Sequence, residues 1–323
     1  MSRIRESLPA FMEEVMASRR VLIGTHLNPD GDALGSAMAV SHILDQLEVP
    51  HDVTCHHGPP TNLRFLPGVG RVKQEAPKKE YDLGVIVDLE ALDRLGSLRN
   101  TFQDIPRLIV IDHHVPHEAP GELRIIDTSS PATAAVLCDL FFDSKIKITP
   151  KIAECLLTGI VTDTGSFRYP NTTPHSLHLA ARLLEQGANL PRITEEIYMK
   201  RQEPALRILG EAIHRMKTSH QGRLAWIVLT EAMMTKANAL DEHTEGIVNE
   251  LLSIDTVEIA AVIREGHSGR FKASLRSRGS HDVAQIAQSF GGGGHKNAAG
   301  LTLDPPADVA EAQIIQALGS LLS

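Results

Sequence analysis

One imidazole and two carboxylates stand close together in residues 26–36 of the sequence. The stretch reads His-Leu-Asn-Pro-Asp-Gly-Asp-Ala-Leu-Gly-Ser and contains His26, Asp30 and Asp32. Nitrogen and carboxylate oxygen donors at this spacing suit a divalent cation. The same residues could instead form an Asx turn in which Asp32 is the N-cap of the next helix. This stretch alone predicts either a metal site or a helix cap.

Three further apolar runs end in aspartate or histidine, and they favour the metal site. A strand buried on both faces is a continuous apolar run, and its carboxyl end is where α/β proteins collect ligands. The runs are residues 83–87, followed by Asp88; residues 108–111, followed by Asp112, His113 and His114; and residues 155–161, followed after one threonine by Asp163. Packing alone gives no reason for an Asp-His-His triplet at the tip of a buried strand. Four elements that each present acid or imidazole groups predict a functional site.

The elements that must position these groups alternate between strand and helix patterns. Strands are expected at 21–25, 51–55, 83–88 and 108–112, and helices at 3–18, 33–47 and 174–186. The run at 155–161 fits either a helix or a strand, since periodicity does not separate the two in short apolar segments. The alternation predicts an α/β fold with a doubly wound parallel sheet. His56 and His57 precede a Gly-Pro-Pro sequence without a nearby carboxylate, and we interpret them as loop residues.

A second domain is expected because chain-breaking residues gather near 187–191. The pattern predicts an α/β domain at 1–187, a helical linker at 188–218 and a smaller α/β domain at 219–323. Strand candidates in the smaller domain are residues 223–229, 259–264 and 271–276, and a helix is expected at 283–289.

Composition and charge restrict the class of protein. The 323 residues are 42% hydrophobic and 22% charged, which is ordinary for a globular protein, and no apolar run is long enough to span a membrane. The widely spaced cysteines fit a cytoplasmic location. A net charge of −8 argues against a protein that coats long nucleic acid, although residues 258–300 hold six Lys or Arg against three acids. A local basic surface of this kind suits a small phosphate-bearing substrate.

The motifs together resemble the DHH phosphoesterase superfamily, which is named for the triplet seen here as Asp112, His113 and His114. A glycine-rich block at 291–300, Gly-Gly-Gly-Gly-His-Lys-Asn-Ala-Ala-Gly, is typical of its DHH-associated domain. Within the superfamily the chain is most similar to the NrnA-like branch, the nanoRNases, described as oligoribonucleases and phosphatases of 3′-phosphoadenosine 5′-phosphate (PAP). The resemblance covers nearly the whole chain. It implies that residues 1–187 are the DHH domain and 219–323 the DHH-associated domain, which would close over the first and choose the substrate.

The resemblance implies two divalent metal ions, with manganese expected and magnesium or cobalt as alternatives. One ion would be held by Asp32, Asp88, His113 and Asp163, and the other by His26, Asp30 and Asp88, so that Asp88 bridges them. Two cations ~3.5–4 Å apart activate a water and clamp a phosphoryl oxygen for in-line attack. His114, left free of metal, would contact the phosphate and act with Asp88 as a catalytic residue.

Substrate contacts are expected mainly from the second domain. The glycine block lets backbone amides approach an anion, and the arginines would pair with phosphate. The candidates are Arg94, Arg264, Arg276, Gly293, Gly294, His295 and Asn297. A solvated surface role is equally compatible with Arg94 and Arg264.

The resemblance therefore implies a two-metal phosphodiesterase and exoribonuclease that cuts short oligonucleotides to mononucleotides and dephosphorylates PAP. Its partners would be short single-stranded oligonucleotides, dinucleotides or nucleoside bisphosphates, without long duplexes or membranes, and a homodimer stays open. The low aromatic content, 4%, disfavours a long stacking groove. The alternatives are a cyclic- or linear-dinucleotide phosphodiesterase and, less favoured because no metal ligand is missing, a non-catalytic nucleotide sensor.

One segment departs from the branch. Its usual Ser-Ser-Thr-x-Glu, which opens a helix, is replaced here by Pro131-Ala132-Thr133-Ala134-Ala135. We expect Thr133 or Ser130 to take over the capping of that helix.

Overall fold

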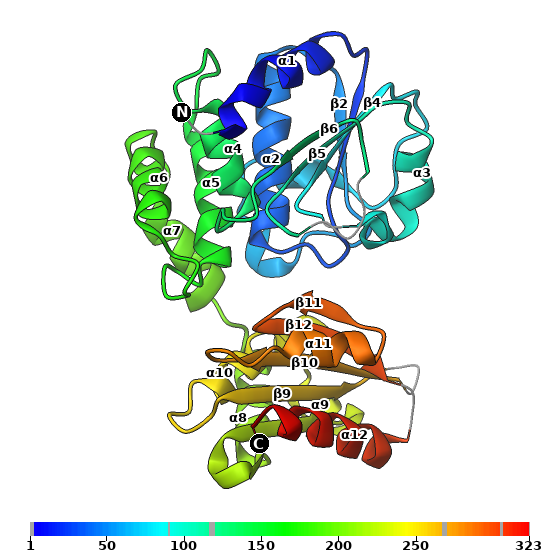
Figure 1. The fold of residues 1–323 in the computed structure, drawn as a ribbon, viewed down its shortest axis with the longest axis vertical. Helices are drawn as coiled ribbons and strands as arrows, with labels where there is room; N and C mark the ends of the chain where they lie inside the picture. The colour runs from blue at the N-terminus through cyan, green and yellow to red at the C-terminus, as the bar shows by residue number, and fades with distance from the viewer. Residues whose placement is uncertain (1–2, 90, 116–119, 267–269, 304–305, 323) are drawn as a thin grey trace. The chain divides into compact units, whose positions relative to one another are not determined.

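Two six-stranded sheets organise the computed structural model of the chain, one sheet in each of two units, Met1–Lys200 and Arg201–Ser323 (Figure 1). The structure describes residues 3–89, 91–115, 120–266, 270–303 and 306–322. The region predicted as a helical linker is shared between the units, because residues 188–200 belong to the first and 201–218 to the second.

The sheet of the first unit is parallel and has the strand order β3-β2-β1-β4-β5-β6. Its strands are β1 (Val21–Gly24), β2 (His51–Thr54), β3 (Val72–Lys73), β4 (Leu83–Val87), β5 (Leu108–Asp112) and β6 (Leu123–Ile126). The chain moves outward from β1 in one direction through β2 and β3, and then returns to the other side of β1 with β4. The order therefore reverses between β1 and β4, and such a switch point is where open α/β sheets bind ligands.

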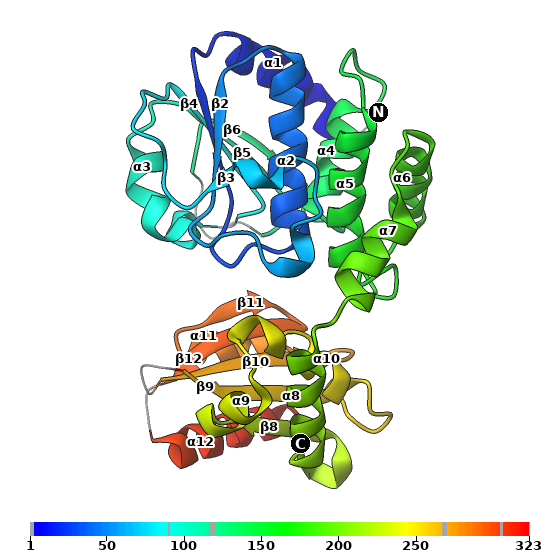
Figure 2. The ribbon, with the colours of Figure 1, turned by 180° about the vertical axis from the view of Figure 1, so that it is seen from behind.

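Helices cover both faces of this sheet, which confirms the predicted doubly wound α/β architecture. The α-helices of the first unit are α1 (Leu8–Met16), α2 (Gly31–Gln46), α3 (Arg99–Gln103), α4 (Thr133–Phe141), α5 (Pro150–Asp163), α6 (Pro174–Glu185) and α7 (Leu190–Thr194). Figures 1 and 2 show α2, α4 and α5 together on one face and α3 on the other, with α6 outside α5.

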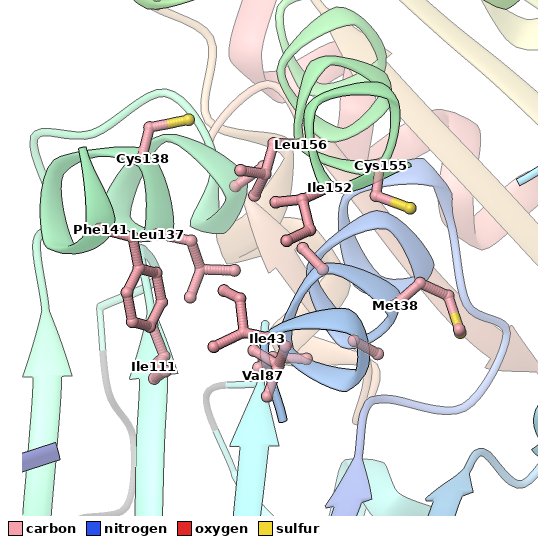
Figure 3. Close-up of a cluster of buried hydrophobic side chains, with 14 of the residues drawn as sticks. Met38, Ile43, Val87, Ile111, Leu137, Cys138, Phe141, Ile152, Cys155 and Leu156 are labelled. Atoms are coloured by element: carbon pink, nitrogen blue, oxygen red, sulfur yellow. The ribbon is translucent and has the colours of Figure 1, made fainter. Parts of the chain in front are cut away.

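The alternation of side chains along each strand supplies two cores. Val85 and Val87 of β4 point to the face that carries α2, α4 and α5, whereas Ile86 between them packs with Phe102 of α3. On the larger face, residues such as Met38, Leu137 and Leu156 interdigitate between the helices and the strands (Figure 3). This core fixes where the ends of α2, α4 and α5 lie relative to the strand tips.

The structure decides the ambiguous run at 155–161 in favour of a helix. It forms the second half of α5, and Ile152 to Val161 are buried throughout because α2, α4 and α6 pack around it. A helix that is apolar on all sides is one that lies inside the protein. Asp163, its last residue, is thereby brought beside the strand tips.

The second unit contains a mixed sheet with the order β11-β12-β10-β9-β8-β7. Its strands are β7 (Lys217–Ser219), β8 (Leu224–Leu229), β9 (Ile259–Glu265), β10 (Phe271–Ser277), β11 (Gly293–His295) and β12 (Ala298–Leu303), and its α-helices are α8 (Glu203–His214), α9 (Glu231–Ala237), α10 (Ile247–Leu252), α11 (Val283–Ser289) and α12 (Ala307–Gly319). Strands β8 and β9 are parallel and the other neighbours antiparallel. The predicted smaller α/β fold is confirmed. In the described part of the chain, no helix is long and apolar enough to cross a membrane.

Candidate metal centre

The predicted metal ligands of the first unit come together at the carboxyl ends of β1, β4 and β5. The loops after these three strands, the first turn of α2 and the last residue of α5 each contribute. Among the described residues, potential ligand atoms form groups, and within each group the atoms lie within 4.8 Å of one another. The groups are His26, Asp30 and Asp88; Asp32, His113 and Asp163; and Asp88, His113 and His114. Residues up to 137 positions apart in the sequence thus share one site, which sits at the topological switch point.

Asp88 lies between the two ligand sets. Its Oδ2 is 3.4 Å from Nε2 of His26, and its Oδ1 is 3.6 Å from Nε2 of His113. The residue follows β4 directly and has a φ of +59°, in the left-handed region that non-glycine residues rarely adopt. This backbone conformation, together with burial of all but 2% of the residue, turns the carboxylate toward both histidines. One oxygen faces each set, an arrangement that suits a ligand shared by two ions.

Asp30, not Asp32, is the N-cap of α2, so the alternative interpretation of Asp32 is wrong. Oδ1 of Asp30 accepts hydrogen bonds from the backbone N–H groups of Asp32 and Ala33. Gly31 between them packs against α5, and a Cβ there would lie 2.3 Å from a side-chain carbon of Thr162. The turn must therefore hold glycine for α2 to approach α5.

Asp32 instead caps another helix. Its two oxygens accept the backbone N–H groups of Thr133 (2.6 Å) and Ala134 (2.9 Å) at the start of α4. The N-cap residue Ala132 makes no side-chain cap, so the expected takeover by Thr133 or Ser130 is also wrong. A carboxylate at a helix N-terminus is favoured by the exposed N–H groups and by the helix dipole. Thr133 has a different role, since its Oγ1 donates to Oδ1 of Asp88 at 2.9 Å.

Asp112, which was not predicted as a site residue, holds His114. Oδ1 of Asp112 accepts the backbone N–H groups of His113 and His114 and lies 2.7 Å from Nδ1 of His114. This carboxylate fixes the orientation of the His114 ring, as outer partners of site histidines commonly do. Oδ2 of Asp112 is buried without a hydrogen-bond partner among the described residues. An acid directly before two histidines was the available signal.

Burial and mutual repulsion perturb the carboxylates. Burial, followed by the charges of Asp30 and Asp88, raises the pKa of Asp163 to about 6 even though His113 lies 3.3 Å away. Burial and the charge of Asp88 likewise raise the pKa of Asp32. Clustered buried acids of this kind are stabilised by cations, and their oxygen and imidazole donors are the ligands that manganese and magnesium accept. The residues present therefore fit a divalent metal centre.

The histidines respond in the opposite way to the same charges. Burial would lower the pKa of His113, but the hydrogen bond to Asp163 and the charges of Asp32 and Asp88 raise it to about 10. For His26, burial is likewise outweighed by Asp88 and Asp30, which raise its pKa to about 9. Protons on these rings partly substitute for the charge that a metal would bring, so metal binding should release protons.

The predicted substrate contacts belong to both units. In the first unit, the carbonyl of Arg94 accepts the N–H of Leu27, which puts the backbone of Arg94 beside the loop at 26–30, here called the ligand loop. In the second unit, Arg264 of β9 pairs with Asp241, and Arg276 of β10 donates to the carbonyl of Leu275. Neither contact by itself points to a substrate.

The glycine block forms a hairpin of β11 and β12 rather than a loose loop. Gly294 has a φ of +137°, and a Cβ there would lie 2.5 Å from the carbonyl oxygen of Ala298, whereas nothing approaches the Cβ position of Gly293. Nδ2 of Asn297 donates to Oγ of Ser277 at 2.9 Å, so it stabilises the neighbouring turn. The side chain of His295 lies outside the described part of the structure.

Comparison with known proteins agrees with the geometry. Residues 20–160 match the DHH family, N-terminal domain, and residues 223–322 match the DHHA1 domain. The bifunctional oligoribonuclease and PAP phosphatase NrnA of Thermus thermophilus is 33% identical over 88% of this chain and 84% of its own length, and that of Bacillus subtilis is 26% identical over 88% and 89%. A crystal structure of an exopolyphosphatase-related protein from Bacteroides fragilis superposes with a TM-score of 0.91 at 28% identity, over 100% of this chain and 98% of that one. The chain belongs to the DHH family and is an NrnA-like member of it.

Proposed function

We propose that this protein is a metal-dependent phosphoesterase that hydrolyses short oligonucleotides to mononucleotides and removes a phosphate from PAP. The observation that carries the proposal is the position of Asp88, whose two oxygens face two separate sets of ligands. The relatives named as NrnA support the same activity and substrate class. A single structural ion would not require a bridging carboxylate between two sets.

Two divalent ions, manganese in our proposal, would occupy these sets. His26, Asp30 and Asp88 would hold one, and Asp32, Asp88, His113 and Asp163 the other. When bound, the pair supplies Lewis-acid stabilisation of the phosphoryl oxygens and activates a water for in-line attack. The ligands carry four carboxylate charges, which nearly balance two divalent cations before the substrate phosphate arrives.

The chain's own residues orient this site. Thr133 and the amino end of α4 hold Asp88 and Asp32 in place, so little reorganisation is needed when charge develops on the phosphate. Asp112 holds Nδ1 of His114, and the ring oriented in this way would donate a proton or hydrogen bond to a phosphoryl oxygen. The carboxylate of Asp112 also stabilises the protonated ring, because it raises the pKa of His114 against the effect of burial.

The second unit would supply contacts to the rest of the nucleotide. The backbone amides of the Gly293–Gly294 hairpin, the side chains of His295 and Asn297, and the guanidinium groups of Arg264 and Arg276 are the proposed contacts, together with Arg94 of the first unit. The excess of basic residues at 258–300 supports binding of a small anionic substrate. We expect short single strands, linear or cyclic dinucleotides and nucleoside bisphosphates to compete for this site, and long duplexes to be excluded.

The decisive experiment combines a substrate series with one substitution. The wild-type protein, supplied with Mn²⁺, should release mononucleotides from 5′-labelled RNAs of two to about ten nucleotides, fastest from the shortest. Asp88→Ala should lower kcat at least about 1,000-fold, because both sets lose the shared ligand. Asp104→Ala, which removes an exposed aspartate outside the site, is the matched control and should retain full activity.

The same assay separates the alternatives. Release of mononucleotides from dinucleotides alone would narrow the proposed substrate class to a dinucleotide phosphodiesterase. Equal turnover by Asp88→Ala and wild type would contradict the bridging role. If the protein bound nucleotides but hydrolysed none of them in Mn²⁺, Mg²⁺ or Co²⁺, it would be a nucleotide sensor and not an enzyme.

A further inference from the structure

His56 and His57 lie in the loop after β2 and have no part in the proposed ligand sets. The two rings contact each other edge to face with centroids 4.3 Å apart. The loop ends beside the ligand loop at 26–30, because β1 and β2 are parallel neighbours whose carboxyl ends meet at the same edge. The two histidines are loop residues, as the sequence predicts, and their hydrogen bonds reach the backbone of the ligand loop and of the loop after β4.

Three successive residues of the ligand loop are held by groups outside it. The thiol of Cys55 donates to the carbonyl of His26 (3.2 Å), and the N–H of Leu27 donates to the carbonyl of Arg94 (2.7 Å). The N–H of Asn28 then donates to Nδ1 of His57 at 3.1 Å. Two of these bonds come from the loop after β2, so that loop is a main support of the ligand loop.

The bond to His57 acts on one peptide unit with a direct connection to His26. Nδ1 of His26 lies 2.8 Å from the carbonyl oxygen of Leu27, and since a carbonyl only accepts, Nδ1 carries the proton. Nε2, 3.4 Å from the carboxylate of Asp88, is then the nitrogen that would lose its proton and bind a metal ion. The Leu27 carbonyl and the Asn28 N–H belong to the same planar trans peptide and point in opposite directions. Fixing one therefore fixes the other.

The backbone of Asn28 needs such support. Its φ is +54°, in the left-handed region, and the next residue is Pro29, which further restricts the backbone that precedes it. Conformations of this kind persist only where surrounding contacts impose them. The hydrogen bond from Asn28 to His57 is a contact of that type.

His56 holds the supporting loop itself. Its Nδ1 accepts the backbone N–H of Ser97 at 3.2 Å and lies 2.8 Å from Oγ of the same residue. Gly96 has a φ of +60°, and a Cβ there would lie 2.9 Å from Cγ of the His56 ring, so the ring needs a glycine beside it. The loops after β1, β2 and β4 are thereby connected to one another.

We propose that His57 is a positioning residue for the metal centre: by accepting the Asn28 N–H it fixes the Leu27–Asn28 peptide plane and, through the Leu27 carbonyl, the ring of His26. This inference rests on the proposed function, because it takes His26 to be a metal ligand. Its effect is local to the set of His26, Asp30 and Asp88. The other set shares Asp88 with it, but Asp32 is held by the amino end of α4 and Asp163 by α5.

The test uses two substitutions at one position. His57→Phe keeps a ring but removes the acceptor, whereas His57→Asn keeps an acceptor atom the same number of bonds from Cα. His178→Phe, at an exposed histidine of α6, is the control. Exchange of the Asn28 amide is followed in metal-free protein, and binding of Mn²⁺ alone is titrated by electron paramagnetic resonance.

His57→Phe should speed hydrogen exchange of the Asn28 amide about tenfold or more. It should also lower the affinity of one of the two Mn²⁺ sites about tenfold. In the hydrolysis assay, kcat should fall by a larger factor than KM rises. His57→Asn and His178→Phe should stay within about twofold of wild type. Equal Asn28 exchange in wild type and His57→Phe would overturn the inference whatever the metals do, and so would His57→Asn behaving like His57→Phe. If wild type bound fewer than two Mn²⁺ ions, the proposed function would be wrong even with the amide protected.

Discussion

The carboxyl and amino ends of the parallel strands, here called the carboxyl edge and the amino edge, hold aspartates in opposite electrostatic surroundings. At the carboxyl edge, the neighbours of Asp32, Asp88 and Asp163 are one another and histidines. At the amino edge, the carboxylate of Asp52 on β2 lies within 3.4 Å of Arg20, Lys73 and Lys79 and accepts a hydrogen bond from Tyr81. The first arrangement groups several carboxylates with imidazoles, whereas the second surrounds one carboxylate with several cations.

The pKa shifts of Asp163, Asp32 and Asp52 follow this difference. For Asp88 at the carboxyl edge, burial is outweighed by the hydrogen bond and charge of His26, and the pKa is lowered. Burial raises the pKa of Asp163 to about 6, and nearby carboxylates add to the effect. Burial would also raise the pKa of Asp52, but the hydrogen bonds from Lys79, Lys73 and Tyr81 outweigh it and bring the pKa below its usual range. The amino edge therefore stabilises the fold, whereas the carboxyl edge gives up stability for a site that needs cations. The predictions below test this division, which is the expected relation between stability and function at active sites.

The largest effect should follow from Asp163→Asn. Loss of this carboxylate removes a proposed ligand and the partner of His113, so hydrolysis of a dinucleotide in Mn²⁺ should fall at least about 1,000-fold. The metal-free protein should nevertheless be as stable as wild type or more so, because one of several repelling carboxylates is gone. Stability is best followed by hydrogen exchange of peptides from the first sheet during urea unfolding, since the single tryptophan, Trp226, lies in the second unit.

A metal-free Asp163→Asn protein clearly less stable than wild type would contradict the comparison, because the carboxyl edge would then be contributing to the fold. Retained activity would instead contradict the assignment of Asp163 as a ligand. Stability and activity are measured on the same preparation, and each measurement contradicts only one of the two conclusions.

Asp52→Asn should have the reverse effect at the amino edge. The substitution leaves Arg20, Lys73 and Lys79 beside one another without the charge that holds them, and we expect a loss of about 2 kcal/mol in the free energy of unfolding at pH 7. Turnover per folded molecule should remain within about twofold of wild type, because the residue is at the opposite end of the strands from the metal centre. A large loss of kcat in folded Asp52→Asn would show that the two edges are coupled.

The pH dependence sharpens this prediction. The pKa of Asp52 is lower in the folded protein than in the unfolded chain, where it is about 3.9. Its contribution is therefore present above that unfolded value and is lost as the pH falls through the folded pKa. The difference in stability between wild type and Asp52→Asn should be full at pH 7 and shrink steadily below about pH 4. A difference that stays constant down to pH 2 would show that the ionised carboxylate is not responsible.

The proposed metal ligands at the carboxyl edge could be predicted from the sequence because they follow apolar runs. Asp88 and His113 directly follow a strand that is buried on both faces, and His26 follows such a strand after one residue. The apolar run before each of them can be seen in the sequence. Asp163 was found in the same way although its run proved to be a helix, because a buried helix and a buried strand share the same apolar composition.

The supporting contacts were not predictable in this way. Asp32 caps α4, and Asn28 donates to His57, only because the sheet order brings distant segments together. A helix N-terminus or a backbone N–H carries no signature of its partner in the sequence. The short edge strands β3 and β6 were also not predicted. Strand β3 has only two residues, and an arginine interrupts the apolar pattern of β6.

The smallest effect should come from Thr133→Val, which replaces a hydroxyl by a methyl group of similar size. Oγ1 of the buried Thr133 donates to the oxygen of Asp88 that faces His113, whereas the Thr133 backbone N–H continues to hold Asp32. Hydrolysis in Mn²⁺ should fall about tenfold, the usual cost of losing a partner of a metal ligand. Thr133→Ser restores the hydroxyl and should recover most of this loss, which a change in packing alone would not allow. If both variants were equally slow, the methyl group of Thr133 and not its hydrogen bond would position Asp88, and the carboxyl edge would depend on packing in the same way as the rest of the core.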